Sequence, residues 1–106
     1  YKKVINENKE NRTEFLLINF DYEDGNDYLA KIFNKEFNMK VVEKKDYIWF
    51  SIIKLCKKNT CYELLWHEDI GNIIYSLEQD EDTVNELELR LQKVLDVLNI
   101  KILESN

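Results

Sequence analysis

The chain has 106 residues, of which 44% are hydrophobic and 34% charged, and its formal net charge is −6. This length fits one domain, residues 1–106, and the apolar content is too high for a disordered acidic tail. Two cysteines are too few for a disulfide-rich scaffold, and no apolar run approaches the roughly 20 residues that cross a bilayer. We therefore expect a single folded domain that is soluble and cytoplasmic, with no membrane partner.

The charges are distributed unevenly along the chain. Residues 1–58 hold twelve Lys and Arg against ten Asp and Glu, whereas residues 59–106 hold three against eleven. No basic residue lies between Lys58 and Arg90. Such a field repels phosphate backbones and attracts basic proteins, although acidic residues also simply keep a small domain in solution. Direct nucleic-acid binding is therefore not expected.

The first part of the chain predicts a strand followed by a helix. Residues 13–20 form a short apolar run typical of a buried strand. The polar cluster Asp24–Asp27 ends this run and supplies an N-cap for a helix. Apolar residues then recur at helical spacing over residues 28–37, and Asn38 is expected to end the helix.

Four further strands are predicted as an antiparallel meander. The turn between the first two is expected at Lys44–Asp46, and Gly71 suits the last turn, at 68–71, because glycine tolerates a positive φ. The expected strands are 39–43, 47–55, 60–67 and 72–78.

The last helix is expected to begin at Thr83, where Thr83 and Glu86 fit a capping box, and to bury a stripe that includes Leu87 and Leu91. Residues 100–104 are expected to add a short edge strand. The predicted fold is therefore α+β: an antiparallel sheet of four to five strands with two helices packed mainly on one face, in the order β-α-β-β-β-β-α.

The two cysteines allow the register of the central hairpin to be predicted. If Cys56 and Cys61 flank its turn, Lys54 lies opposite Glu63 as an attractive pair. One face then becomes the expected core, and the other an apolar band with a polar rim, although Tyr and Trp are enriched at interfaces and the two faces could be exchanged. The expected core face holds Tyr47, Trp49, Ser51, Ile53, Leu55, Tyr62, Leu64, Trp66, Ile73, Tyr75 and Leu77. The apolar band holds Phe50, Ile52, Leu65 and Ile74.

Cys56, Cys61 and His67 are the residues most able to carry chemistry. As a metal site they lack a fourth ligand unless Glu68 or Asp69 supplies it, so we expect no metal and no cofactor. A disulfide is sterically feasible, but a reducing cytosol favours the two free thiols that we expect. The register places His67 about 20 Å from Cys61, which is too far for a catalytic pair.

Other catalytic signatures are missing from the sequence. Glu63 and Glu78 could form a carboxylate pair, but nothing nearby in the sequence raises the pKa of either. Gly25 and Gly71 are the only glycines, which excludes a phosphate-binding loop. We therefore expect no catalytic residue and no enzymatic activity. A small enzyme that uses the cysteines or the histidine is the weakest alternative.

Several acidic and aromatic features lie close together in the second half. They are the basic-free run 59–89, the pair Glu68-Asp69, the acidic block 78–82, and the nearby Trp66 and Tyr75. With its size, its charge and its lack of a catalytic set, the chain resembles the immunity proteins that neutralise bacterial nuclease toxins, including those of contact-dependent growth inhibition systems.

The resemblance implies that carboxylates take the place of nucleic acid in the basic cleft of a cognate toxin, while aromatic anchors slow dissociation. The partner would be a basic toxin, most readily a nuclease, bound by a monomer. The partner-binding residues expected on this basis are Glu63, Trp66, His67, Glu68, Asp69, Asn72, Tyr75, Glu78, Asp80 and Asp82.

A homo-oligomeric structural or regulatory domain is the competing hypothesis. It would pair the apolar band across a two-fold axis and would form a dimer with little dependence on salt. The immunity hypothesis instead predicts a monomer that captures a basic protein, more weakly as the salt concentration rises.

Overall fold

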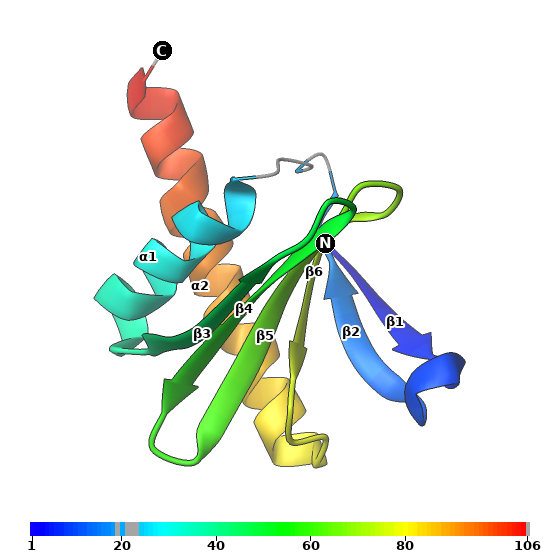
Figure 1. Ribbon diagram of the computed structural model, residues 1–106. Helices are drawn as coiled ribbons and strands as arrows, with labels where there is room; N and C mark the ends of the chain where they lie inside the picture. Colours follow the sequence, from blue (N-terminus) through cyan, green and yellow to red (C-terminus); the bar gives the residue numbers. More distant parts are fainter. Residues whose placement is uncertain (19, 21–23, 106) are drawn as a thin grey trace.

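A computed structural model of the chain describes residues 1–18, 20 and 24–105. A six-stranded antiparallel sheet carries both helices on one face (Figure 1). The α+β class is confirmed, but the sheet has six strands rather than four to five. The strands are β1 (Lys2–Asn6), β2 (Arg12–Leu16), β3 (Lys40–Asp46), β4 (Phe50–Lys57), β5 (Thr60–His67) and β6 (Gly71–Ser76); the helices are α1 (Gly25–Phe37) and α2 (Glu81–Ser105), and a short 3-10 helix (Glu7–Lys9) joins β1 to β2.

The unexpected strand is β1, which forms one edge of a sheet with the order β1-β2-β6-β5-β4-β3. Its sequence, KKVIN, has too few apolar positions to predict a strand, because an edge strand with exposed side chains needs few. Strand β2 confirms the strand expected within 13–20 but ends at Leu16, and Asn19 of the predicted run lies outside the described residues.

The hydrophobic core lies between the sheet and the two helices. Full burial of one large apolar side chain contributes roughly 1.5–3 kcal/mol, so this layer dominates the stability of the fold. Helix α1 supplies Leu29, Ile32 and Phe33, helix α2 supplies Leu87, Leu91 and Val94, and the sheet supplies Phe15, Ile53, Leu55, Tyr62, Leu64 and Ile74.

The predicted register of the β4–β5 hairpin is confirmed. Cys56 lies opposite Cys61, and Lys54 lies opposite Glu63. Four of the apolar helix-facing side chains of these strands, Ile53, Leu55, Tyr62 and Leu64, are buried as expected, whereas Trp66 is only partly buried. The predicted core face is therefore correct for most of β4 and β5.

In β6 the predicted alternation is wrong by one residue. Leu64 lies opposite Ile74, which places Ile74 in the core, while Ile73 and Tyr75 lie on the helix-free face. The cause is the β5–β6 turn, in which three residues separate the paired His67 and Gly71. The predicted turn, 68–71, has four residues, and a turn that is one residue shorter moves every later side chain of β6 to the opposite face. Gly71 has φ 102°, as its predicted role in the turn requires.

The turn between β3 and β4 lies three residues later than predicted. Residues Lys44–Asp46 belong to β3, and the chain reverses at Tyr47–Trp49. Phe50 is the first residue of β4 and pairs with His67, the last residue of β5. Because β5 offers no partner beyond His67, the three preceding residues project past the sheet. Tyr47 and Trp49 are therefore exposed rather than in the core.

The helix ends differ in part from the prediction. Asn38 ends α1 in the left-handed conformation, as expected, but Asp24 makes no side-chain capping bond. At the start of α2, the carboxylate of Asp80 accepts hydrogen bonds from the backbone N–H and the hydroxyl of Thr83. Asp80 is therefore the cap, and the predicted Thr83 capping box is wrong. No Gly or Pro interrupts the helix, which continues to Ser105, so the strand expected at 100–104 is helical.

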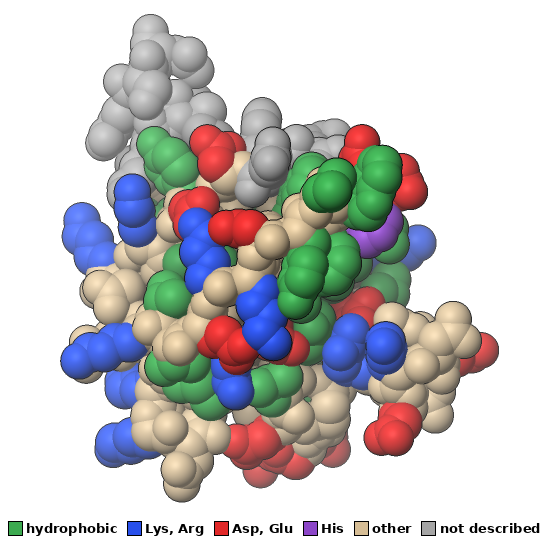
Figure 2. All heavy atoms as spheres, in the orientation of Figure 1, with side chains coloured by type: hydrophobic (Ala, Val, Ile, Leu, Met, Phe, Trp, Pro, Cys, Tyr) green, Lys and Arg blue, Asp and Glu red, His purple; other side chains and the backbone are tan. Residues whose placement is uncertain are grey.

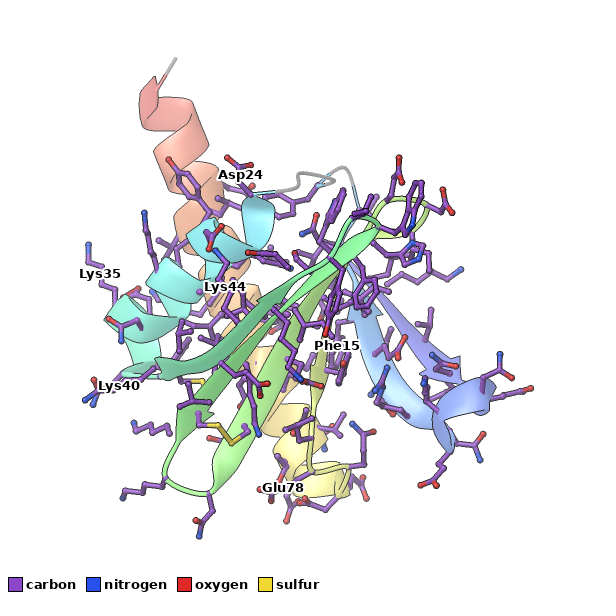
Figure 3. All side chains as sticks on the ribbon, viewed as in Figure 1. Phe15, Asp24, Lys35, Lys40, Lys44 and Glu78 are labelled. Atoms are coloured by element: carbon purple, nitrogen blue, oxygen red, sulfur yellow. A yellow bond between two sulfur atoms is a disulfide. The ribbon has the colours of Figure 1, made fainter. Side chains whose placement is uncertain are left out.

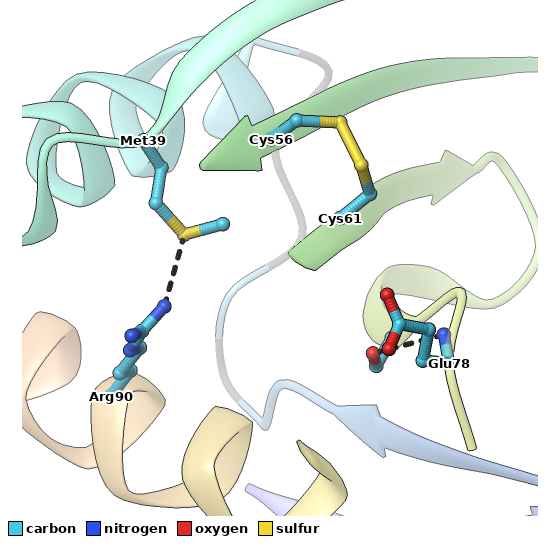
Figure 4. The surroundings of a disulfide bond; sticks show 6 residues. Met39, Cys56, Cys61, Glu78 and Arg90 are labelled. Atoms are coloured by element: carbon cyan, nitrogen blue, oxygen red, sulfur yellow. Dashed lines mark hydrogen bonds between the residues drawn. A yellow bond between two sulfur atoms is a disulfide. The ribbon is translucent and has the colours of Figure 1, made fainter. Parts of the chain in front are cut away.

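The two cysteines form a disulfide between β4 and β5, with Cα atoms 4.2 Å apart (Figure 4). The expectation of two free thiols is therefore wrong. It rested on the redox potential of the cytosol, whereas directly opposed cysteines of a hairpin already have a Cα separation near that of a disulfide. The disulfide closes the sheet end at the β4–β5 turn. On the core side nearby, the guanidinium of Arg90 contacts the sulfur of Met39 at 3.7 Å (Figure 4).

Candidate protein-binding surface

Of the ten residues expected to bind a partner, nine lie in three separate regions. Glu68 and Asp69 form the β5–β6 turn, next to His67 and Trp66 at the end of β5. Glu63 and Tyr75 lie in the middle of the helix-free face. The third group, Glu78, Asp80 and Asp82, lies at the opposite end of β6, whose six residues span roughly 20 Å (Figure 3). The tenth, Asn72, lies inside the molecule.

The middle region is a closed structural network. The hydroxyl of Tyr75 donates to the carboxylate of Glu63 at 2.8 Å, and the Arg12 guanidinium lies 3.5 Å from the centre of the Tyr75 ring. Arg12 also pairs with the buried Glu14 at 2.7 Å. Burial, and then the hydrogen bond to Glu63, raise the pKa of Tyr75 well above its ordinary value. Tyr75 is only 4% exposed, so it supports the sheet rather than meeting a partner.

Asn72 also has a structural position. Its side chain is fully buried, and its amide donates to the side-chain oxygen of Asn26 at 3.0 Å. Asn26 in turn donates to the carbonyl of Leu64 at 3.1 Å, so the two asparagines tie α1 to the sheet. Asn72 and Tyr75 do not belong to the candidate surface, because their side chains are not accessible.

The acidic groups of the third region take part in starting α2. Hydrogen bonds from Thr83 to Asp80 lower the pKa of the Asp80 carboxyl, which holds the cap in its charged form. Glu81 and Asp82 occupy the first turn of the helix, where its dipole favours negative charge. The local helix therefore accounts for these acids without a partner.

The remaining region contains the most exposed apolar residues near acidic groups. We define the apical surface as Asp46, Tyr47, Ile48 and Trp49 at the β3–β4 turn together with Glu68, Asp69 and Ile70 at the β5–β6 turn. Ile48 is 83% exposed and Trp49 is 62% exposed. Figure 1 shows the two turns side by side, and Figure 2 shows hydrophobic side chains gathered there beside acidic groups and the histidine.

Hydrogen bonds hold the apical surface in place. The N–H of Glu68 donates to the carbonyl of Trp49 at 2.9 Å, which joins the two turns. Within the second turn, Asp69 donates its N–H to the Nδ1 atom of His67, and Ile70 donates to the His67 carbonyl. His67 thus supports the acidic turn from below. The carboxylates are presented by backbone that is already ordered, which lowers the entropy lost on binding.

The two lysines nearest the apical surface, Lys44 and Lys45, form ion pairs with carboxylates outside it. Lys44 pairs with Asp27 and Lys45 with Glu43, and these hydrogen bonds raise the pKa of each lysine. Among the residues that the structure describes, no ion pair involves Asp46, Glu68 or Asp69. Asp46 also helps to raise the pKa of Lys44, so its charge is partly offset, and the least offset charges are those of Glu68 and Asp69. The apical surface therefore combines negative charge with exposed aromatic and aliphatic groups.

Tyr47, Ile48 and Trp49 are the functional candidates that the sequence analysis missed. A signal for them was present, because the register that pairs Cys56 with Cys61 brings Phe50 opposite His67, the last residue before an acidic turn. Residues that precede Phe50 then have no neighbour on β5. Because residues 47–50 have the apolar composition of a strand, the sequence alone does not show that the strand begins only at Phe50.

The residues expected to be most able to carry chemistry, the two cysteines and His67, are not brought together. His67 lies at the opposite end of β5 from the disulfide. In the described ranges, no three His, Cys, Asp or Glu side chains gather as metal ligands would. Nor does any described helix have the length and apolar content to cross a membrane. Comparison of the chain with protein-family models, curated proteins and solved structures gives no match in any of the three.

Proposed function

We propose that this protein is an immunity protein that binds and neutralises a basic bacterial toxin, with a nuclease as the expected class. The observation that carries the proposal is the apical surface, where the unpaired carboxylates of Glu68 and Asp69 flank the exposed Ile48 and Trp49. Carboxylates speed association with a basic surface, and burial of aromatic and aliphatic groups slows dissociation. The toxin would be inhibited because its basic cleft is filled.

The competing function is self-association through the apolar band. One of the four residues of this band does not lie on the helix-free face. Ile74 lies in the core, not on the helix-free face. Ile52 is half-buried, and charged groups such as Lys54 and Glu63 line the same hollow. A band broken by charges is a poor dimer interface, because those charges would have to be desolvated. We therefore favour the monomer that captures a basic protein.

The test uses the product of the gene immediately upstream, since an immunity gene follows its toxin gene. Co-expression with the present protein is expected to protect cells from that product. The two proteins are also expected to co-purify at low salt and to separate progressively as salt rises. Failure to recover a basic partner at low salt, together with no protection, would contradict the proposed function.

Charge reversal can identify which acidic group binds. The double variant Glu68→Lys/Asp69→Lys is expected to weaken the complex roughly tenfold or more at low salt, mainly through slower association. Glu78→Lys/Asp82→Lys is the matched control, because it makes the same change of net charge at the other end of β6. If the control variant binds more weakly than the apical variant, the site is at the start of α2 instead.

A further inference from the structure

We infer that the apical surface binds an arginine side chain of its partner. The proposed site is a shallow hollow of about 630 Å³, here called the aromatic hollow, that is lined by Asp46, Tyr47, Ile48, Trp49 and Phe50. This inference rests on the proposed function, since it names the group by which a basic protein would be recognised. The guanidinium would lie against the aromatic rings with the Asp46 carboxylate as its counter-ion.

The lining of the aromatic hollow has the chemistry that a guanidinium requires. The rings of Tyr47 and Phe50 are stacked, with centroids 4.5 Å apart and planes 23° apart, so they present a preformed aromatic wall. Trp49, the ring that attracts cations most strongly, is 62% exposed beside them. A carboxylate in the same hollow gives the guanidinium N–H groups a charged acceptor. None of the five lining residues is basic, although Lys44 interacts electrostatically with Asp46 and Lys45 with Tyr47.

The protein holds both of its own arginines with the same combination of groups. Arg12 lies 3.5 Å from the centre of the Tyr75 ring and pairs with Glu14 at 2.7 Å. Arg90 lies 5.4 Å from the centre of the Phe37 ring and pairs with a glutamate one helical turn earlier. In each case an aromatic ring and a carboxylate share one guanidinium. The aromatic hollow offers these two groups to a guanidinium from outside.

An arginine of a basic protein fits the hollow better than a lysine, a second copy of this chain or an anionic membrane. Its planar guanidinium can stack on a ring and bond to a carboxylate at once, and it is more weakly hydrated than the ammonium of lysine. A second copy of this chain would bring Glu68 and Asp69 toward like charges, and an anionic membrane would be repelled in the same way. The negative charges therefore favour a basic protein surface as the partner.

The direct test is an NMR titration with short capped peptides, which needs no knowledge of the partner. The probes are a glycine–arginine–glycine peptide, the lysine analogue of equal charge, and the uncharged analogue with citrulline. The readout is the indole N–H signal of Trp49, distinguished from that of Trp66 with a Trp66→Phe variant. The arginine peptide is expected to shift the Trp49 signal with an affinity in the millimolar range, the lysine peptide to bind more weakly, and the citrulline peptide to have no effect.

Matched variants separate the aromatic hollow from general surface effects. Trp49→Ala and Tyr47→Ala are each expected to weaken binding of the arginine peptide roughly two- to fivefold. Tyr28→Ala is the control for Tyr47→Ala, because Tyr28 is 55% exposed but lies on α1 and Tyr47 is 52% exposed. Asp46→Asn keeps the shape of the hollow and removes its charge. It should therefore weaken binding of the arginine peptide more at low salt than at high salt.

The inference is overturned if the arginine and lysine peptides bind equally, because general electrostatic attraction then explains both. It is also overturned if citrulline binds as well as arginine, or if the hollow binds phosphatidylcholine vesicles and not the arginine peptide. These outcomes are independent of the proposed function. A basic partner lost on reversal of Glu68 and Asp69 but unaffected by Trp49→Ala would support the function and refute the arginine site.

Discussion

Opening the disulfide between Cys56 and Cys61 should destabilise the protein without weakening its proposed interaction. The bond joins residues five positions apart, so it closes a short loop. The loop-entropy relation gives a stabilisation of about 2 kcal/mol for a loop of this length, compared with about 3 kcal/mol for 15 residues. For a chain of 106 residues, about 2 kcal/mol corresponds to a fall of roughly 10 °C in the melting temperature.

The assay is urea or thermal unfolding, with and without a thiol reductant. A double Cys56→Ala/Cys61→Ala variant is the control, since it should already show the lower stability and should not respond to the reductant. Binding to the basic partner should be unchanged in both, because the β4–β5 turn and the apical surface lie at opposite ends of β5. An unfolding midpoint that is the same in oxidised and reduced protein would refute the calculation. A loss of binding on reduction would show that the disulfide and the apical surface are not independent.

Two further predictions concern the cap of α2 and the buried tyrosine. Asp80→Ala removes the acceptor of both Thr83 hydrogen bonds and should lower the unfolding midpoint. Asp80→Asn and the neighbouring Asp82→Ala should lower it less. Equal effects of the two alanine variants would contradict the assignment of Asp80 as the cap. Because the folded state raises the pKa of Tyr75, its stabilising contribution is present below the ordinary tyrosine pKa near 10 and is lost as the pH rises further. The free energy of unfolding of the native protein, measured with urea, should therefore fall more steeply above pH 10 than that of Tyr75→Phe. If the free energies of the two proteins change in parallel with pH, Tyr75 does not contribute in this way.

The parts of the fold that were predictable from the sequence are those fixed by local pattern. The hairpin register followed from the position of the two cysteines on either side of the turn, and it agrees with the opposite charges of the paired Lys54 and Glu63. Helix α1 and the stop at Asn38 followed from periodicity and one residue suited to the left-handed conformation. In these cases one short segment contains all the information that decides the structure.

The parts that were not predictable depend on a neighbour distant in the sequence or on the count of turn residues. Strand β1 is a strand because β2 pairs with it, although its own pattern is weak. The position of Ile74 depends on whether the β5–β6 turn holds an even or an odd number of residues, and the sequence fits either. The expected interface was affected most, because Tyr75 and Asn72 were assigned to the accessible surface and both are buried.

The location of the apical surface makes the function testable apart from the fold. Ile48 and Trp49 project beyond the last pair of the β4–β5 ladder, and neither belongs to the core cluster. The hydrogen bond from Glu68 to Trp49 that joins the two turns is made by backbone atoms, so side-chain substitutions leave it in place. Exposed side chains usually contribute within about 0.5 kcal/mol to stability. A substitution at the apical surface that abolishes binding therefore reports on recognition, whereas the same result from Tyr75 or Asn72 would report on unfolding.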